Sequence, residues 1–378
     1  MSQPTNVVQQ YQSKSVFISS GSFDVDQTVA GSLQQLTRVT DCSWNINYPL
    51  SDNVYIDGGM EPAYVTPPSI DVTVGFYHTN GTNERFMGLA KFDNTGQLIL
   101  GLDQEKSLYI SVEDEAGIDA IGASQSAART VIGMAQATLS SYQLAAQVGG
   151  LIRAEATFNC LTAFVYTGSS GQHMAAVDPQ NGEPLTGQFV LPSPSSQYIE
   201  SATGTTGLFI NTAAIGGQDM IMMFPKNSPF GVTYTGTNAV YLQGVDLSMV
   251  VQRQDVKPLG YVFPEGRGII YPIEVSLNTE AIVSRYQADQ LQRFACATNT
   301  GFSINVVVKQ PCSAITMFGF YFTDMQLVSQ SFGNSVGSMD TVTSQWRGWL
   351  KSPQDTFIDP WLTTIVRLDT TGAWGESW

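Results

Sequence analysis

The sequence predicts an all-β protein with minor α content, built as two tandem β-barrel or sandwich domains with one flanking helix each. Three observations predict this fold. Apolar and polar residues alternate with period two in several runs, the pattern of strands with one buried face. Two blocks of sequence recur in the same order. Glycine, tyrosine and phenylalanine number 35, 15 and 19, and only 13% of residues are charged, as expected of a β-rich body with weakly charged surfaces.

The first recurring block is a strand pair joined by a long, polar loop. Its second occurrence covers residues 240–283 and its first covers residues 39–77. The alternating residues Val245, Leu247, Met249 and Val251 follow Cys42, Trp44, Ile46 and Tyr48 at a spacing of 203. Pro68 and Pro272 are 204 positions apart, and at that spacing the apolar faces of the two following runs fall one residue out of phase.

The second recurring block is a long strand, a turn and a closing strand. Val148-Gly149 and Val336-Gly337 are 188 positions apart, and so are Phe158 and Trp346. Strand-like runs at residues 131–146 and 318–330 precede the two turns. Two blocks that recur in the same order indicate a duplicated domain.

These repeats predict five parts of the chain. They are an N-terminal arm with short strands (1–35), a first domain (36–168), a linker or insertion with short strands (169–238), a second domain (239–352) and a C-terminal extension (353–378).

In the first domain the expected strands are runs rich in apolar and aromatic residues. Together with the preceding arm they cover residues 16–18, 23–25, 36–77 (the strand pair and its loop), 98–102, 108–112, 131–147 and 153–166. After the Asn80-Gly81 turn signal, Thr82-Asn83-Glu84 is expected to cap a short helix. The small, polar residues 117–128 are expected to form a loop or flap.

The remaining elements follow the same reasoning. Short strands are expected at residues 188–191, 208–211 and 220–224 in the linker, and at 302–308, 318–327 and 342–350 in the second domain. A helix is expected at residues 280–296, because Ile282, Tyr286, Leu291 and Phe294 share one helical face.

The net charge of −15 argues against tight binding of nucleic acid, because the chain repels phosphates. The acidic excess serves solubility, or it lines a surface past which DNA slides without binding; the sequence leaves both open. No run approaches the roughly 18 apolar residues of a membrane span, and the N-terminus lacks the apolar core of a signal peptide.

Residue types that carry catalysis or bind metals are present without a recognised arrangement. His78 and His173 stand apart in the sequence, the carboxylates Asp178, Asp219 and Asp340 form no motif, and Glu113-Asp114-Glu115 lacks calcium-loop spacing. The glycine-rich residues 264–268 open no helix and are better explained as a hairpin loop than as a phosphate cradle. We therefore predict a protein that is not an enzyme, with no catalytic, cofactor-binding or metal-binding residues.

The four cysteines lie singly in apolar context and form no metal-ligand spacing. Cys42, Cys160, Cys296 and Cys312 are expected to be reduced core residues, with a disulfide between subunits as the alternative.

The repeated unit resembles the tail tube (major tail) proteins of long-tailed bacteriophages. The resemblance rests on the order of a strand pair with a long loop, a helix after a TNGTNERFMGL-type turn, and a strand ending near SSYQLAAQVGG. It covers residues 42–76, 84–89 and 137–150, and again 245–278, 280–296 and 323–337. Family members with two fused barrels form trimeric rings of pseudo-sixfold symmetry.

The resemblance implies a virion structural protein of the phage tail, assembled in the host bacterial cytoplasm. Its implied partners are further copies in trimeric rings and stacked tubes, the tape measure protein, tail terminator and baseplate proteins, and double-stranded DNA passing through the lumen without specific binding. The alternative is a two-domain β binding module of a baseplate or adhesin that recognises a surface glycan, favoured by Trp361, Trp374 and Trp378 near the chain end.

The tube hypothesis carries two structural expectations. The polar loops at residues 51–67 and 256–268 should lie at contacts between stacked rings. The bore should be net acidic or neutral, with Arg253, Lys257, Arg267, Arg285 and Arg293 engaged at interfaces between the barrels.

Overall fold

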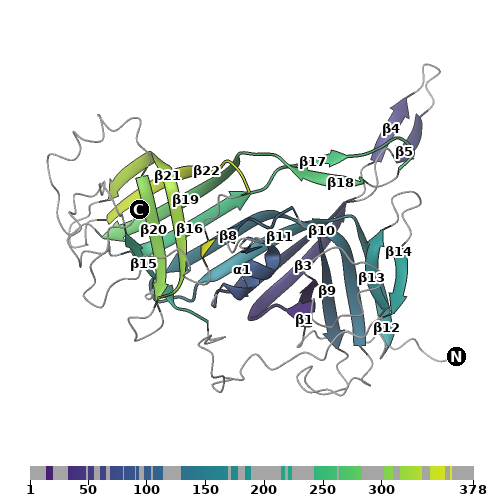
Figure 1. Cartoon of the computed structure of the whole chain (residues 1–378), viewed down its shortest axis with the longest axis horizontal. Helices are drawn as coiled ribbons and strands as arrows, with labels where there is room; N and C mark the ends of the chain where they lie inside the picture. The colour runs from purple at the N-terminus through teal and green to yellow at the C-terminus, as the bar shows by residue number, and fades with distance from the viewer. Residues whose placement is uncertain are drawn as a thin grey trace.

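The computed structural model is mostly β-sheet, as the sequence predicts, and the described residues include one short α-helix (Figure 1). Every strand pairing among the described residues is antiparallel. The structure describes residues 14–19, 33–47, 50–54, 60–64, 69–79, 81–89, 91–92, 98–103, 105–113, 129–168, 172–177, 184–188, 214–217, 220–223, 242–261, 264–282, 302–309, 316–333, 341–353 and 358–359.

One continuous sheet spans both halves of the chain. Its strands are β3 (Val39–Asn47), β6 (Ser69–Tyr77), β11 (Arg153–Cys160), β10 (Arg129–Gln147), β16 (Leu242–Val250), β19 (Ile273–Ile282), β22 (Thr341–Leu350) and β21 (Thr316–Gly333), in that spatial order. The first four strands come from the first half of the sequence and the last four from the second. The two halves meet where β10 pairs with β16.

Two strands are long enough to bend from this sheet into a second layer. The first part of β10 pairs with β9 (Lys106–Glu113) and β12 (Thr162–Gly168), and β9 also pairs with β1 (Lys14–Ser19), which pairs with β2 (Leu33–Gln35). The first part of β21 pairs with β20 (Phe302–Lys309) and β23 (Ile358–Asp359), and β20 pairs with β15 (Met220–Met223). Among the described strands no sheet closes on itself, so the closed barrels expected from the sequence are not seen.

The strand pairings of the two halves have the same register. Leu139 lies opposite Phe158, and Leu327 opposite Trp346, with 188 positions between each residue and its counterpart. Trp44 lies opposite Val72, and Leu247 opposite Leu277, which are 203 and 205 positions apart. The spacing of 205, one more than the two prolines indicate, brings the apolar residues of β6 and β19 into phase. The apparent phase difference in the sequence was therefore an error of one residue in the alignment.

The irregularities of the two halves also coincide. The pairing of β10 with β11 shifts between Leu139 and Ser141, and that of β21 with β22 between Leu327 and Ser329. The only non-glycine residues with positive φ in β10 and β21 are Gln136 (φ 50) and Asp324 (φ 57), again 188 positions apart. A bulge re-aims a strand and strengthens its bend. Both halves therefore bend their long strand at the same place.

The expected polar loops contain two-stranded hairpins. β4 (Leu50–Val54) pairs with β5 (Met60–Tyr64), and β17 (Arg253–Val256) pairs with β18 (Gly266–Ile269). Each hairpin interrupts the strand pair of its half, and Figure 1 shows both extending away from the sheets. The expected polar loops therefore contain paired strands, and the sequence indicated a hairpin only at residues 264–268, because period-two alternation is weak in these short strands. Smaller hairpins join β7 (Lys91–Phe92) to β8 (Leu98–Ile99), and β13 (Gln172–Val177) to β14 (Pro184–Gln188).

The helix of the first half is α1 (Thr82–Met87), one short turn capped by Gly81 and not by a side chain. Asn83 instead exchanges hydrogen bonds with the backbone of Thr37, which ties α1 to the strand-pair region. The helix expected at residues 280–296 was wrong at its start, because residues 280–282 extend β19 and pair with β22. Its other residues lie outside the described part of the chain.

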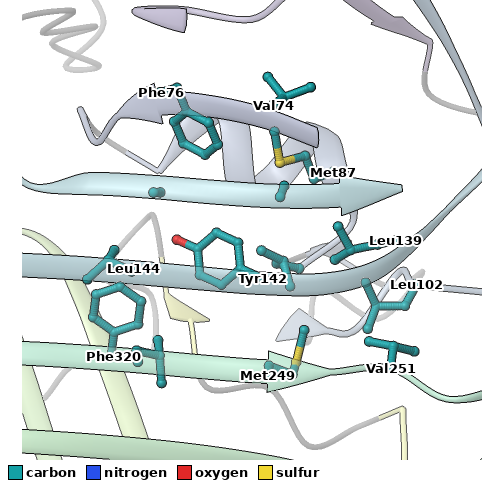
Figure 2. Packing of buried hydrophobic residues seen from close by; sticks show 14 of the residues in the cluster. Val74, Phe76, Met87, Leu102, Leu139, Tyr142, Leu144, Met249, Val251 and Phe320 are labelled. Atoms are coloured by element: carbon teal, nitrogen blue, oxygen red, sulfur yellow. The ribbon is translucent and has the colours of Figure 1, made fainter. Parts of the chain in front are cut away.

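A single apolar core runs beneath the sheet and continues across the two halves. Figure 2 shows Phe320 beside Leu144, and Met249 below Tyr142. Phe158 and its counterpart Trp346 are both fully buried. Cys160 is a buried free thiol, as expected of a reduced core cysteine, and Cys42 is only half-buried, while Cys296 and Cys312 lie outside the described residues.

Several expectations fall partly or wholly outside the described residues. The strand expected at residues 220–224 corresponds to β15. The strands expected at 23–25 and 208–211, the flap at 117–128 and most of the C-terminal extension are not described. Within the described residues, no helix is both long enough and apolar enough to cross a membrane.

Candidate assembly surfaces

The joint between the two halves is a strand pairing. Residues 141–147 of β10 pair with residues 244–250 of β16, with Leu144 opposite Leu247 and Tyr142 opposite Met249. These four side chains are at most 2% exposed. Burying a large apolar side chain contributes about 1.5 to 3 kcal/mol. The joint is therefore a packed, hydrogen-bonded interface and not a loose linker.

Arg253 at the base of the β17–β18 hairpin reaches across this joint. Its Nη2 atom donates to the backbone oxygen of Leu102 at 2.6 Å and lies 3.5 Å from that of Leu139. Burial, together with the nearby charge of Arg267, lowers the pKa of Arg253 to about 10. Glu105 and Asp103 act in the opposite direction and favour the charged guanidinium.

Arg267 on the other strand of the hairpin makes a second anchor. Its Nη1 atom donates to the backbone oxygen of Asn159 at 3.0 Å and to Thr138 Oγ1 at 3.3 Å, and its Nε lies 3.6 Å from Asp255 Oδ1. Arg253 and Arg267 thus bind the second half of the chain to the first. Lys257 is exposed, and Arg285 and Arg293 lie outside the described residues.

The described strand path ends at β3 on one side of the molecule. By register, β3 corresponds to β16, which pairs with strands on both sides. Trp44 and Ile46 of β3 are 38% and 39% exposed, whereas their counterparts Leu247 and Met249 are 2% and 1% exposed. These two apolar residues of β3 are therefore partly exposed where their counterparts in β16 are buried.

The second end of the sheet is the last part of β21. Residues 326–333 pair with β22, whereas the corresponding part of β10 pairs with both β11 and β16. Phe332 is 48% exposed and its counterpart Leu144 is 2% exposed. At the two ends of the sheet, the counterparts of residues that are buried in the β10–β16 joint are therefore partly exposed.

One face of this sheet is polar from end to end. Residues paired across successive strands project to the same face, and here these are mostly Ser, Thr, Asn, Gln and carboxylates. The charged members among the described residues are Asp41, Asp71, Arg153, Glu155, Asp246, Glu274, Glu280 and Arg347.

The two arginines of this polar face each have an acidic neighbour on the same face. Arg153 Nη2 lies 2.9 Å from Asp41 Oδ2, and Arg347 Nε lies 2.9 Å from Glu274 Oε1. All four side chains are about half exposed, so each pair contributes little to stability. The pairs do leave the face with an acidic excess and with its described arginines partly neutralised.

The most unusual titratable group is the buried cluster of His78, Glu84 and Tyr142. Glu84 Oε1 lies 2.7 Å from His78 Nδ1 and accepts a hydrogen bond from the Tyr142 hydroxyl at 3.1 Å. Burial alone would raise the pKa of Glu84. The charge of His78 and hydrogen bonds from His78, the backbone and Tyr142 outweigh the effect of burial, so the pKa of Glu84 is lowered. Burial, reinforced by Glu84, raises the pKa of Tyr142. All three side chains are at most 1% exposed, so dissolved substrates do not reach them.

The other residues considered from the sequence do not come together in the described structure. His173 lies in β13, Glu113 ends β9, and Asp178, Asp219, Asp340 and the three C-terminal tryptophans are not described. Residues 264–268 enter a hairpin, as expected, and its positive-φ glycine is Gly260. No group of three potential metal ligands occurs among the residues that the structure places. The glycan-binding alternative therefore remains a prediction.

Sequence reasoning did not identify the two exposed sheet ends. The signal was present in the repeat itself, because Trp44 and Ile46 align with residues of a strand that a duplicated domain places in the middle of the sheet. The Glu84 cluster had no signal, because its members come from three separate elements.

Comparison with known proteins gives no further assignment: no protein-family model matches the chain, and no curated protein matches it.

Proposed function

We propose that this chain is a structural subunit of a phage tail tube, in which copies join edge to edge into rings that stack around a passage for double-stranded DNA. The observation that carries the proposal is the β10–β16 joint, together with the two sheet ends that match it. The chain already contains one joint between two equivalent units. Its free ends are the two partners needed to form the same joint again.

A tandem duplication is supported by the shared registers. Seven strands of the first half have counterparts in the second: β1, β3, β6, β9, β10, β11 and β12 correspond to β15, β16, β19, β20, β21, β22 and β23. The β4–β5 and β17–β18 hairpins correspond in the same way. We propose that each half is one tail-tube-like domain.

The joint between copies follows from this equivalence. If β21 of one copy pairs with β3 of another as β10 pairs with β16, Phe332 lies opposite Trp44 and Gln330 opposite Ile46. The half-exposed apolar side chains then become buried, at about 1 to 3 kcal/mol each. Such head-to-tail contacts close into a ring when the rotation permits. Two open sheet ends are also an aggregation hazard that ring closure removes.

The polar face suits the lining of the passage. In a ring built by extending this sheet, the apolar face packs against the second layer of sheet, and the polar face is left to line the central passage. An acidic lining repels phosphates and offers few cations to hold them, so DNA passes without being bound. The resemblance to tandem tail tube proteins supports three copies per ring. It also supports tape measure, tail terminator and baseplate proteins as partners, and a place in the virion tail.

The proposal is tested by the assembly state of purified full-length protein. We expect rings or tubes in negative-stain images and in sedimentation velocity. Trp44→Lys and Phe332→Lys should each keep the fold but abolish assembly, because a charge would be buried in the new joint. Arg85→Ala, at an exposed position of α1, is the control and should assemble normally. A wild-type protein that stays monomeric, or edge variants that assemble as wild type does, would contradict the proposal.

A further inference from the structure

Two apolar surfaces lie at opposite ends of the strands that form the joint within the chain. β10 and β16 run antiparallel and pair over residues 141–147 and 244–250, so the end of β10 lies beside the start of β16. The turn from β10 to β11 therefore leaves one end of the joint. The β17–β18 hairpin leaves the other end, beyond β16 and β19 (Figure 1). At about 3.4 Å of rise per residue, about 20 Å of strand separates the two ends.

The first surface is the end of the β17–β18 hairpin. Leu259 is fully exposed there, and Val256 at the end of β17 is 58% exposed. The backbone N–H of Tyr261 donates to the oxygen of Pro258 at 3.3 Å, which closes a turn around Leu259. Gly260, the third residue of this turn, has φ 90, which glycine adopts without strain. The turn therefore holds Leu259 outward, and we call Val256 and Leu259 the hairpin tip.

The second surface is the turn from β10 to β11, where Val148 is 52% exposed and Leu151 is 47% exposed. This turn is also fixed by the backbone. The N–H of Val148 donates to the oxygen of Gln243 at 3.0 Å, and Leu151 forms a β-bridge with Gly216. We call Val148 and Leu151 the receiving turn. Because the backbone of both surfaces is already ordered, a contact between them costs little conformational entropy.

We propose that the hairpin tip of one copy docks on the receiving turn of a second copy stacked on it. The inference rests on the proposed function, because it names the two surfaces that meet when rings stack. The occupant is a second copy because each chain carries both surfaces, at opposite ends of β10 and β16. A displacement along these strands brings the tip of one copy to the receiving turn of the next, whereas within one chain the joint lies between them.

The repeat in the sequence keeps apolar residues at the equivalent positions of the other unit. Ile56 stands 203 positions before Leu259, and Val336 and Met339 follow the receiving-turn residues at a spacing of 188, whereas the counterpart of Val256 is polar. Ile56, Val336 and Met339 lie outside the described residues, so this support comes from the sequence alone. Each copy gives a tip on one side and receives a tip on the other, so the contact repeats along the axis and does not close.

The test is whether full-length variants form rings that do not stack. Leu259→Asp and Leu151→Asp should each raise the protein concentration needed for stacking about tenfold or more, because an unpaired carboxylate would be buried in an apolar contact. Both should still form rings, since the β21–β3 joint is unchanged. Ile270→Asp is the matched control at the base of the same hairpin, where the side chain is 44% exposed, and should stack as wild type does. Sedimentation velocity over a concentration series and negative-stain images separate single rings from stacks.

The outcomes separate this inference from the proposed function. If either aspartate variant stacks at wild-type concentrations, or if Ile270→Asp loses stacking as they do, the contact between tip and receiving turn is overturned while the ring stands. A wild type that forms no rings would overturn both. If an aspartate variant does not fold, as read by circular dichroism, Leu259→Ser and Leu151→Ser serve instead, with a smaller loss of stacking expected from each.

Discussion

Single residues hold the two halves of the chain together, and Arg267 is the clearest case. It crosses from the second half and donates to a backbone oxygen and a threonine hydroxyl of the first half, and Glu105 of the first half attracts its charge. A guanidinium presents several donors in a fixed fork, which a lysine ammonium does not reproduce. The hydrogen-bonding geometry of this contact is therefore specific to arginine.

Arg267→Met should lower the free energy of unfolding by about 1 to 3 kcal/mol, because two hydrogen bonds from a partly buried charged group are lost. Arg267→Lys should recover only part of the loss. Urea unfolding followed by tryptophan fluorescence measures the change, and Lys257→Met, at an exposed position of the same hairpin, should stay within about 0.5 kcal/mol of wild type. If Arg267→Met were as stable as wild type, the hydrogen bonds of Arg267 would not stabilise the contact between the two halves.

The buried Glu84 should make stability depend on pH in the acid range. Its folded pKa lies below its ordinary value of 4.5, so its ionised form is favoured by folding. The stabilisation is present above the unfolded pKa and is lost as pH falls through the folded pKa. Glu84→Gln should destabilise the protein by about 3 kcal/mol at pH 7, since it breaks a buried pair.

Unfolding of Glu84→Gln and wild type measured from pH 7 to pH 3 checks this prediction. The difference between the two proteins should shrink as the pH falls below about 4.5. A difference that stays constant over the whole range would show that Glu84 does not contribute through its charge.

At the scale of elements, the sequence predicted most strands and the repeat, and the reasons for the failures are local. Alternation found β6, β16 and β19 because each has one buried face. It missed the β4–β5 and β17–β18 hairpins, whose sequences carry no apolar residues at a period of two. It assigned the start of a helix to the end of β19, since Ile282 fits a helical face with Tyr286 as well as it fits a strand.

The candidate assembly surfaces depended on pairing, which the sequence does not contain. A spacing of 204 seemed right because two prolines share it, and only the strand register shows that 205 is correct. The exposure of Trp44 became meaningful only beside the burial of Leu247. The buried cluster of His78, Glu84 and Tyr142 could not be predicted from the sequence, because its members lie in separate elements and meet only through the packing of α1 and β10 beside the end of β6.

At the scale of the whole molecule, the two halves share one extended sheet (Figure 1) and one apolar core (Figure 2). The earlier expectation that the arginines lie between the domains fits Arg253 and Arg267, while the expectation of a net acidic bore remains a prediction. The base of the β17–β18 hairpin is anchored on the other half of the same chain, and the expected contact of both hairpins with a neighbouring ring remains a prediction.

The lining predicts how assembled protein treats DNA. Assembled wild type should bind a short labelled duplex only weakly at low salt. Glu155→Lys/Asp246→Lys places two lysines on the polar face and should raise that affinity, with a steep decrease as salt is added. Fluorescence anisotropy measures the binding, and Glu155→Gln/Asp246→Asn separates the added charge from the lost carboxylates. No gain for the lysine variant over the neutral one would show that the polar face is not exposed to the passage.

The central claim is that the joint between copies repeats the joint within the chain, and a cysteine pair in register tests it most directly. In a Cys42→Ser background, Trp44→Cys and Phe332→Cys should lie directly opposite each other, with Cβ atoms about 4.5 to 5.5 Å apart. Trp44→Cys with Gln330→Cys is the control, because its residues lie on the diagonal at about 7 to 8 Å. Under mild oxidation the account predicts covalent ladders of whole chains from the first pair, with the fold retained and few from the second. Equal cross-linking of both pairs, or none from Trp44→Cys/Phe332→Cys in assembled protein, would contradict it.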